Sequence, residues 1–296
     1  IIIYVAIMMG IGVYTARQTR SVSDFVLGSH SVGSWLTAFA YGTSYFSAVV
    51  FIGYAGQFGW TYGVSAAWVG IGNALLGSLL AWIVLGRRTR IMTQSLGAKT
   101  MPEYFEKRWN SKGLKIAAAL IVFVFLIPYT ASVYNGLSRL FNMAFQIESE
   151  GAYKIIIIVM ALLTAIYVIL GGYAATAIND FIQGIVMLIG IAAVVICAIQ
   201  NQGGLTSALA ALGEIEVNGK TNTLNSVFGP DPLNLLGVVI LTSLGTWGLP
   251  QMIHKFYAIK SENDIKKGAV ISTVFALIVA GGSYLLGGFD RLFCTL

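Results

Sequence analysis

The chain has 296 residues, of which 57% are hydrophobic and only 10% are charged, and its mean hydropathy is +0.79. Soluble domains carry about 25% charged residues, so this composition excludes an ordinary soluble protein and indicates a membrane protein. The formal net charge of +6 does not indicate nucleic-acid binding, because the basic residues lie in short loops without interleaved aromatic side chains.

The membrane spans are predicted to be helices. Several apolar windows exceed the roughly 20 residues that cross a bilayer as a helix, and the sequence lacks the alternating pattern of an outer-membrane barrel. Each backbone amide in lipid needs an internal partner, which a helix supplies. We predict eight spans, near residues 1–16, 32–56, 61–86, 115–146, 152–172, 174–199, 233–257 and 268–288.

The first span opens with IIIYVAIMMG, which contains neither an initiator methionine nor a signal-peptide cleavage pattern. We interpret this as a truncated start. The distribution of basic residues predicts the orientation, because cytoplasmic loops are enriched in Lys and Arg. Loops 17–31, 87–115, 171–174 and 255–267 together hold 14 of the 18 basic residues. With eight alternating spans, this places the N-terminus outside.

The second predicted span contains an unusual polar stretch, Gly42-Thr43-Ser44-Tyr45-Phe46-Ser47, in its middle. If the helix unwinds there, it frees backbone carbonyl groups, which are tolerated only where they line a cavity or hold an ion. Carbonyl and hydroxyl oxygens suit a small alkali cation. The alternative is that these hydroxyl groups bond back to the preceding turn at a crossing of small residues.

The seventh predicted span, LNLLGVVILTSLGTWGLPQMIHKFYAI, is also interrupted, by Gly245, Gly248 and Pro250. The predicted topology directs it opposite to the second span, five helices away. A pair of Gly/Pro-interrupted spans at corresponding positions is the sequence pattern of a secondary transporter with inverted repeats and a site near the membrane midplane.

Asp180 is a further candidate, in GGYAATAINDFIQG near the start of the sixth span. Carboxylates inside membranes are costly, so a cation route is the functional hypothesis. The alternative is a solvated Asp180, or one paired with a loop lysine. Trp247 and Gln251 could face a substrate, whereas His254 and Lys255 are interpreted as interfacial, with Lys255 extending toward the membrane surface.

Other classes of activity lack a sequence pattern. The chain contains no zinc spacing, nucleophile elbow, P-loop or dinucleotide fingerprint, and Cys197 and Cys294 are isolated. An enzyme is therefore not predicted. Uphill transport would have to draw on an ion gradient, since no ATP-binding segment is present. A channel would need a continuous polar pore.

Five stretches, distributed in order along nearly the whole chain, carry a resemblance to the sodium/solute symporter family. This family includes carriers of proline, pantothenate, sialic acid and glucose, and the bacterial proline-permease branch looks nearest. The stretches are SDFVLGSHSVGSW, GTSYFSAVVFIGYAG, TMPEYF, GGYAATAINDFIQ and GLPQMIHKFYA.

The resemblance implies an all-α membrane protein with a core of two inverted five-helix repeats and one preceding helix, truncated after the seventh core helix. Residues 1–31 would form the first helix and a cytoplasmic loop, 32–199 the first repeat, 200–232 an extracellular loop, and 233–296 the incomplete second repeat. We expect the eighth to tenth core helices to lie outside this chain.

The resemblance also implies site residues. The family's sodium ion is held by backbone carbonyls that fall here on Thr43 and Phe46, and the aspartate of its exit path falls on Asp180. The solute would lie between the two interrupted helices, near Ser44, Tyr45, Ser47, Trp247, Pro250 and Gln251.

Two departures bear on the substrate. Proline permeases carry an aspartate at the position of Tyr45, where this chain is more similar to pantothenate-type members. Sugar carriers place polar side chains at the positions of Val49 and Val50.

The resemblance implies sodium-coupled import of a small organic solute, an amino acid such as proline or a related carboxylate, across the inner or plasma membrane. Carriers of the same fold for pantothenate, sialic acid or sugar, or coupled to protons, are the alternatives.

Overall fold

A computed structural model describes residues 2–17, 19, 21–28, 32–46, 49–146, 149–217 and 219–293. Within these ranges the regular structure is helical, and β-structure is confined to the single bridges Val32–Ile259 and Val217–Lys220. The chain divides into two compact units. Unit 1 comprises 1–44, 82–182 and 248–268, and unit 2 comprises 45–81, 183–247 and 269–296.

Several helices are long and apolar enough to cross a membrane. In the described chain, four such segments lie at Ala55–Leu96, Lys112–Phe145, Gly151–Asn201 and Glu262–Phe293. A fifth span is broken into Pro232–Gly248 and Pro250–Ala258. The protein is therefore a multi-pass membrane protein, as its composition predicts.

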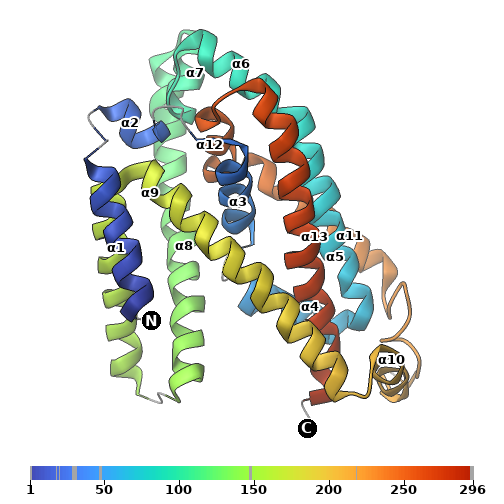
Figure 1. Cartoon of the computed structure of the whole chain (residues 1–296). Coiled ribbons are helices and arrows are strands. Elements are labelled where there is room, and N and C mark those ends of the chain that lie inside the picture. The colour runs from blue at the N-terminus through green and yellow to red at the C-terminus, as the bar shows by residue number, and fades with distance from the viewer. Residues whose placement is uncertain are drawn as a thin grey trace. The chain divides into compact units, whose positions relative to one another are not determined.

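In unit 1, α1 (Ile2–Ala16) lies along the first part of α9 (Glu150–Asn201), as Figure 1 shows. The two helices approach closely at Gly12, where an added Cβ would lie 3.3 Å from the carbonyl oxygen of Tyr167. Small residues at such crossings are typical of membrane helices.

The predicted turn at residues 171–174 is confirmed by the backbone of Gly172. Its φ of 57° and ψ of −150° are non-helical and divide α9 into two helical segments. A Cβ on this residue would lie 2.7 Å from the carbonyl oxygen of Phe25, just before the end of α2 (Val22–Leu27). Both the positive φ and the close approach require glycine.

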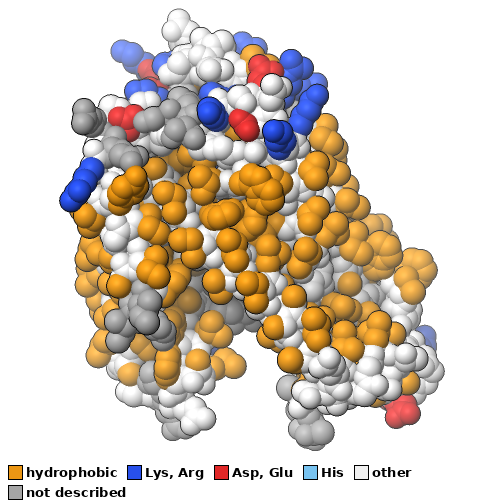
Figure 2. Space-filling view, in the orientation of Figure 1, with side chains coloured by type: hydrophobic (Ala, Val, Ile, Leu, Met, Phe, Trp, Pro, Cys, Tyr) orange, Lys and Arg blue, Asp and Glu red, His pale blue; other side chains and the backbone are white. Residues whose placement is uncertain are grey.

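The polar end of unit 1 is built from α6 (Arg87–Leu96) and α7 (Met101–Trp109). Thr100 caps the start of α7, and Pro102 lies in its first turn. Figure 2 shows Lys and Arg side chains gathered, with acidic ones, at this end, above a broad hydrophobic surface. After α7 comes α8 (Lys112–Phe145), a helix that continues without a break through Pro128.

The remaining helices of unit 1 are α3 (Ser34–Tyr45, with Tyr45 itself in unit 2) and α12 (Pro250–Ala258). Arg90, only 3% exposed, donates from α6 to the carbonyl oxygens of Tyr257 and Lys260, each at 3.4 Å. A cation on the carbonyl groups of a helix C-terminus is stabilising, so Arg90 fixes the end of α12.

Unit 2 contains the second part of α9, most of α13 (Glu262–Phe293) and several shorter elements. These are η2 (Val49–Tyr54), α4 (Ala55–Tyr62), η3 (Gly63–Ala66), α5 (Ala67–Gly72), η4 (Asn73–Leu79), α10 (Leu205–Glu214), α11 (Pro232–Leu244) and η6 (Gly245–Gly248, with Gly248 itself in unit 1). α4 and α13 meet at two glycines: a Cβ at Gly59 would lie 2.0 Å from the carbonyl carbon of Gly287. η4 and η5 (Trp82–Gly86, in unit 1) are π-helical segments, which often accompany functional sites.

Candidate functional site

The end of α3 carries the first group of predicted residues. Gly42, Thr43 and Ser44 are helical, and the helix ends at Tyr45. The predicted unwinding from Gly42 onward is therefore wrong for residues 42–45. The hydroxyl of Thr43 donates to the carbonyl oxygen of Phe39 at 2.9 Å, the bond to the preceding turn that was the alternative interpretation.

The chain leaves the helix at Phe46, and Ser47 lies outside the described residues. A helix has no intrahelical donor for its last four carbonyl groups. Thr43 is among the last four residues of α3, so its main-chain oxygen can serve as a ligand although its hydroxyl is engaged within the helix.

In unit 2, Tyr45 contacts the seventh predicted span. Its hydroxyl donates to the carbonyl oxygen of Thr242 at 3.0 Å, and it shares a hydrogen bond with the side chain of Thr246. Its ring stacks on Phe46 with centroids 4.5 Å apart. Residues at the first interruption therefore bind directly to residues at the second.

Asn73 at the start of η4 joins the same cluster and was not predicted. Thr242 and Ser243 both donate to its side-chain oxygen, at 3.0 and 3.1 Å, and Tyr284 shares a further hydrogen bond with it. Asn73 is 2% exposed. An Asn inside the apolar stretch GIGNALLG was the available signal, because a polar side chain within a span needs a partner.

The interruption of the seventh span is confirmed. α11 ends at Leu244, η6 follows, and α12 begins at Pro250. Leu249 is extended, with φ −70° and ψ 125°, as expected for a residue that precedes proline. In η6, the indole of Trp247 donates to the carbonyl oxygen of Leu76 at 3.0 Å.

In unit 1, Asp180 of α9 forms an ion pair with Lys255 of α12, with Oδ2 and Nζ 3.5 Å apart. Lys255 is 6% exposed, so its interpretation as an interfacial residue is wrong. Its ammonium group also lies 5.2 Å from the ring centroid of Tyr173. A buried ammonium group requires such partners because removing a charged group from water costs free energy. The ring of His254 meets the same tyrosine edge-on.

A pocket of about 340 Å³ adjoins this ion pair within unit 1. The side-chain nitrogen and the side-chain oxygen of Gln251 are both buried, and neither has a hydrogen-bond partner among the described residues. The pocket is lined by Thr100, Met101, Pro102, Val122, Leu126, Tyr173, Pro250, Gln251, His254, Lys255 and Tyr257.

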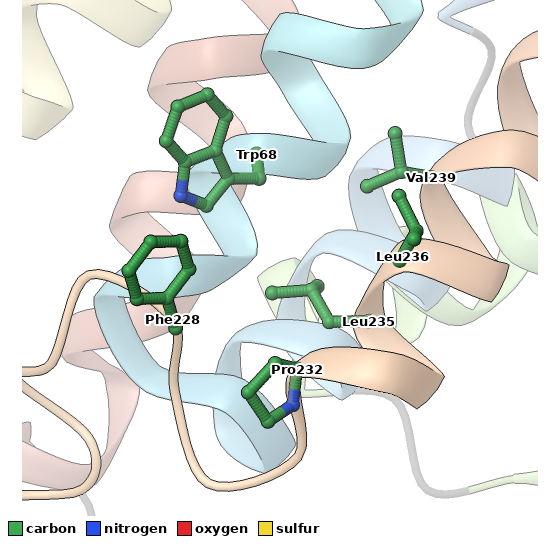
Figure 3. Close-up of a pocket in the computed structure, with 6 residues that line it drawn as sticks. All are labelled: Trp68, Phe228, Pro232, Leu235, Leu236 and Val239. Atoms are coloured by element: carbon green, nitrogen blue, oxygen red, sulfur yellow. The ribbon is translucent and has the colours of Figure 1, made fainter.

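A second pocket, of about 240 Å³, belongs to unit 2 and is apolar (Figure 3). In its lining, the indole of Trp68 donates to the carbonyl oxygen of Val227 at 2.9 Å. Its lining comes from α5, α11 and the segment before α11: Trp68, Phe228, Pro232, Leu235, Leu236 and Val239.

The predicted residues thus divide between the units. Thr43, Ser44, Asp180, Pro250 and Gln251 belong to unit 1, and Tyr45, Phe46 and Trp247 to unit 2. The chain passes between the units at five places, and two of them, Ser44/Tyr45 and Trp247/Gly248, fall at the end of α3 and within the interruption of the seventh predicted span.

These features define a multi-pass helical membrane protein in which one span is interrupted, between α11 and α12, and a polar cluster joins that span to the end of α3. The sequence matches the Sodium:solute symporter family over residues 25–295, and the chain belongs to this family.

Relatives from Staphylococcus aureus, in strains JH9 and NCTC 8325, are named sodium/proline symporter. Each is 33% identical over 293 residues, which cover 97% of this chain and 54% of the relative. The chain therefore spans about half the length of these relatives.

The fold is similar to that of a solved structure described as the substrate-bound outward-open state of a Na⁺-coupled sialic acid symporter. The TM-score is 0.71 at 17% identity, and the match covers 98% of this chain and 60% of that one.

Proposed function

We propose that the protein is a sodium-coupled symporter that imports a small organic solute by alternating access. The observation that carries this proposal is the hydrogen bond from Tyr45 to the Thr242 carbonyl, because it joins residues at the two interruptions. Paired interruptions mark the midplane site of inverted-repeat transporters. Membership of the symporter family supports the same function.

The proposed architecture is a pair of inverted five-helix repeats. Residues 32–199 form the first repeat and 233–296 the start of the second, with 1–31 as a preceding helix and loop and 200–232 as an extracellular loop. The opposite predicted directions of the two interrupted spans support this arrangement. The excess of basic residues in alternate loops supports an N-terminus outside the plasma membrane.

Sodium, the co-transported ion, is proposed to bind the carbonyl oxygens of Thr43 and Phe46. Both lie where α3 ends, and a helix end leaves carbonyl oxygens without an intrahelical donor. Hard oxygen ligands suit an alkali cation. Asp180, the carboxylate of the ion pair with Lys255, is proposed to receive the ion on its way to the cytoplasm.

The solute is proposed to lie near Ser44, Tyr45, Ser47, Trp247, Pro250 and Gln251. An amino acid such as proline, or a related carboxylate, is supported by the name of the Staphylococcus relatives. The alternative solutes are pantothenate, sialic acid and a sugar. The similar fold of a sialic acid symporter is the reason to keep sialic acid among them. Sodium and solute each raise the affinity for the other, because linkage is reciprocal.

The test is uptake into proteoliposomes by the protein expressed from its complete reading frame. Labelled proline, pantothenate, sialic acid and glucose are offered with an inward sodium gradient. We expect uptake of one solute that requires sodium and that collapses in Asp180→Asn. Uptake driven equally well by a proton gradient without sodium would overturn the choice of ion and favour the proton-coupled alternative.

A further inference from the structure

Lys255 is a buried cation that, among the described residues, has one ionic partner, Asp180. The distance of 3.5 Å to Asp180 exceeds the 2.7–2.9 Å that is typical of a charge-assisted hydrogen bond. An ammonium group has three N–H donors, and the ring of Tyr173 supplies only a cation–π contact. The contacts of Lys255 with the described residues therefore leave N–H donors of its ammonium group without a close acceptor.

Two further polar groups lie beside Lys255 in the lining of the pocket. In the described part of the chain, the buried Gln251 amide and the buried hydroxyl of Tyr173 have no hydrogen-bond partner. Both residues line the 340 Å³ pocket together with Lys255. Buried polar groups are rarely unpaired, and several around one cavity indicate a polar ligand.

We propose that this pocket binds the carboxylate group of the transported solute, with the ammonium group of Lys255 as its anchor. The Gln251 amide and the Tyr173 hydroxyl donate to the same carboxylate. This inference rests on the proposed function and specifies its substrate class: solutes that carry a carboxylate.

The charge and shape of the pocket favour such a ligand. Among the described residues its lining includes one charged side chain, the ammonium group of Lys255, whose charge the neighbouring Asp180 balances until a ligand binds. The first residues of α7 also line it, and the N-terminus of a helix favours negative charge. Apolar side chains supply a surface for the carbon skeleton, and the volume lies within the range of small-molecule pockets, about 300–1,000 Å³.

Binding of a carboxylate changes the partner of Asp180. A carboxylate on Lys255 replaces the charge of Asp180 and releases that side chain to hold a sodium ion. One internal ion pair is thereby exchanged for two ion pairs, each with one transported ligand. The local net charge is unchanged, and each ligand favours the arrangement that the other requires, which couples the two.

The test compares each acid with its neutral methyl ester. Labelled proline, pantothenate and sialic acid are each bound to purified full-length protein in nanodiscs, and each is displaced by its unlabelled free acid or by its methyl ester. The variants are Lys255→Arg, Lys255→Met and Lys255→Met/Asp180→Asn. The double variant removes the carboxylate that Lys255→Met would leave without a partner, so it keeps the test valid if the single variant fails to fold.

We expect the double variant to weaken binding of the acid by about tenfold or more, with little change for its ester, because a hydrogen bond to a charged group is lost. Lys255→Arg, which keeps the cation, should retain the preference for the acid. Lys266→Met, which removes an exposed lysine from α13 in the same unit, is the matched control.

An unchanged ratio of acid to ester affinity in the double variant would overturn the inference. So would sodium-dependent uptake of glucose without uptake of any carboxylate, although this result would leave the proposed symport intact. Binding of the acids that depends on Lys255, without sodium-dependent uptake of any solute, would instead overturn the proposed function and retain the pocket.

Discussion

The hydroxyl of Tyr45 donates a hydrogen bond to the carbonyl oxygen of Thr242 at 3.0 Å, although the two residues are 197 positions apart in the chain. Thr242 is among the last four residues of α11, whose carbonyl groups have no intrahelical donor. Tyr45, the last residue of α3, therefore satisfies a backbone group exposed by the end of another helix. The end of α3 and the last turn of α11 stabilise each other in this way.

Replacing Tyr45 with Phe removes this donor and retains the ring. We expect Tyr45→Phe to lower the free energy of unfolding by about 1–3 kcal/mol, because a buried carbonyl group is left unpaired. Thermal unfolding of the purified protein measures the effect. Tyr54→Phe, at a tyrosine that is 42% exposed in the same unit, is the control and should be nearly neutral. Equal stability of the two variants would contradict the structural role of the bond.

The Tyr45 ring packs directly against Gly77, where there is no room for a side chain. A Cβ on Gly77 would lie 2.0 Å from the tyrosine hydroxyl oxygen, so Gly77→Ala must displace the ring. We expect a loss of about 1–3 kcal/mol, as for other overpacked sites. Gly237→Ala in α11 is the matched control, because nothing lies within 4 Å of its added Cβ. Alanine favours a helix over glycine, so the control should be neutral or stabilising. A stabilised Gly77→Ala would contradict the contact.

Some of this arrangement could be predicted from local sequence. Pro250 lacks an N–H group and restricts Leu249, so the break in the seventh span follows from the residues at the break itself. The turn at Gly172 was predictable in the same way, from paired glycines between two apolar stretches.

The end of α3 and the partners of Lys255 depend on more than local sequence. A threonine hydroxyl can bond back within a helix or face a cavity, so Thr43 alone does not locate the helix end. A lysine near the end of a span, such as Lys255, usually extends its ammonium group to the membrane surface. Its burial depends on α9, which brings Asp180 to it from a distant part of the chain.

Thr43→Ala tests whether the Thr43 hydroxyl holds sodium. Because that hydroxyl donates to Phe39 within α3, we expect its loss to raise the KM for sodium by no more than about threefold, with a stability cost of about 0.5–1.5 kcal/mol. Sodium-dependent uptake and thermal unfolding measure the two effects. A rise in the sodium KM by orders of magnitude would instead identify the hydroxyl as a ligand.

Gly172→Ala tests the turn within α9. Its φ of 57° and the 2.7 Å approach of the Phe25 carbonyl oxygen both oppose a side chain. We expect a loss of at least about 1 kcal/mol, because alanine is strained in this conformation. Gly190→Ala, in the second segment of α9 with nothing within 4 Å of its Cβ, should be neutral or stabilising. The turn would need revision if both variants unfolded at the same temperature.

The ion pair of Asp180 and Lys255 can be tested by a double-mutant cycle. Their side chains are 22% and 8% exposed, so removal of either partner leaves a largely buried charge. We expect Asp180→Asn and Lys255→Met each to destabilise the protein by about 1–4 kcal/mol, and the double variant to be more stable than either single variant.

Thermal unfolding of the four proteins at constant pH and salt measures this coupling. Because the pair is buried, the coupling should persist at high salt, unlike that of the exposed pair Arg87–Glu262, which serves as the control cycle. Strictly additive effects for Asp180 and Lys255 would show that the two side chains do not stabilise each other. The exchange of this pair for two transported ions would then have no basis, since there would be no internal pair for sodium and carboxylate to replace.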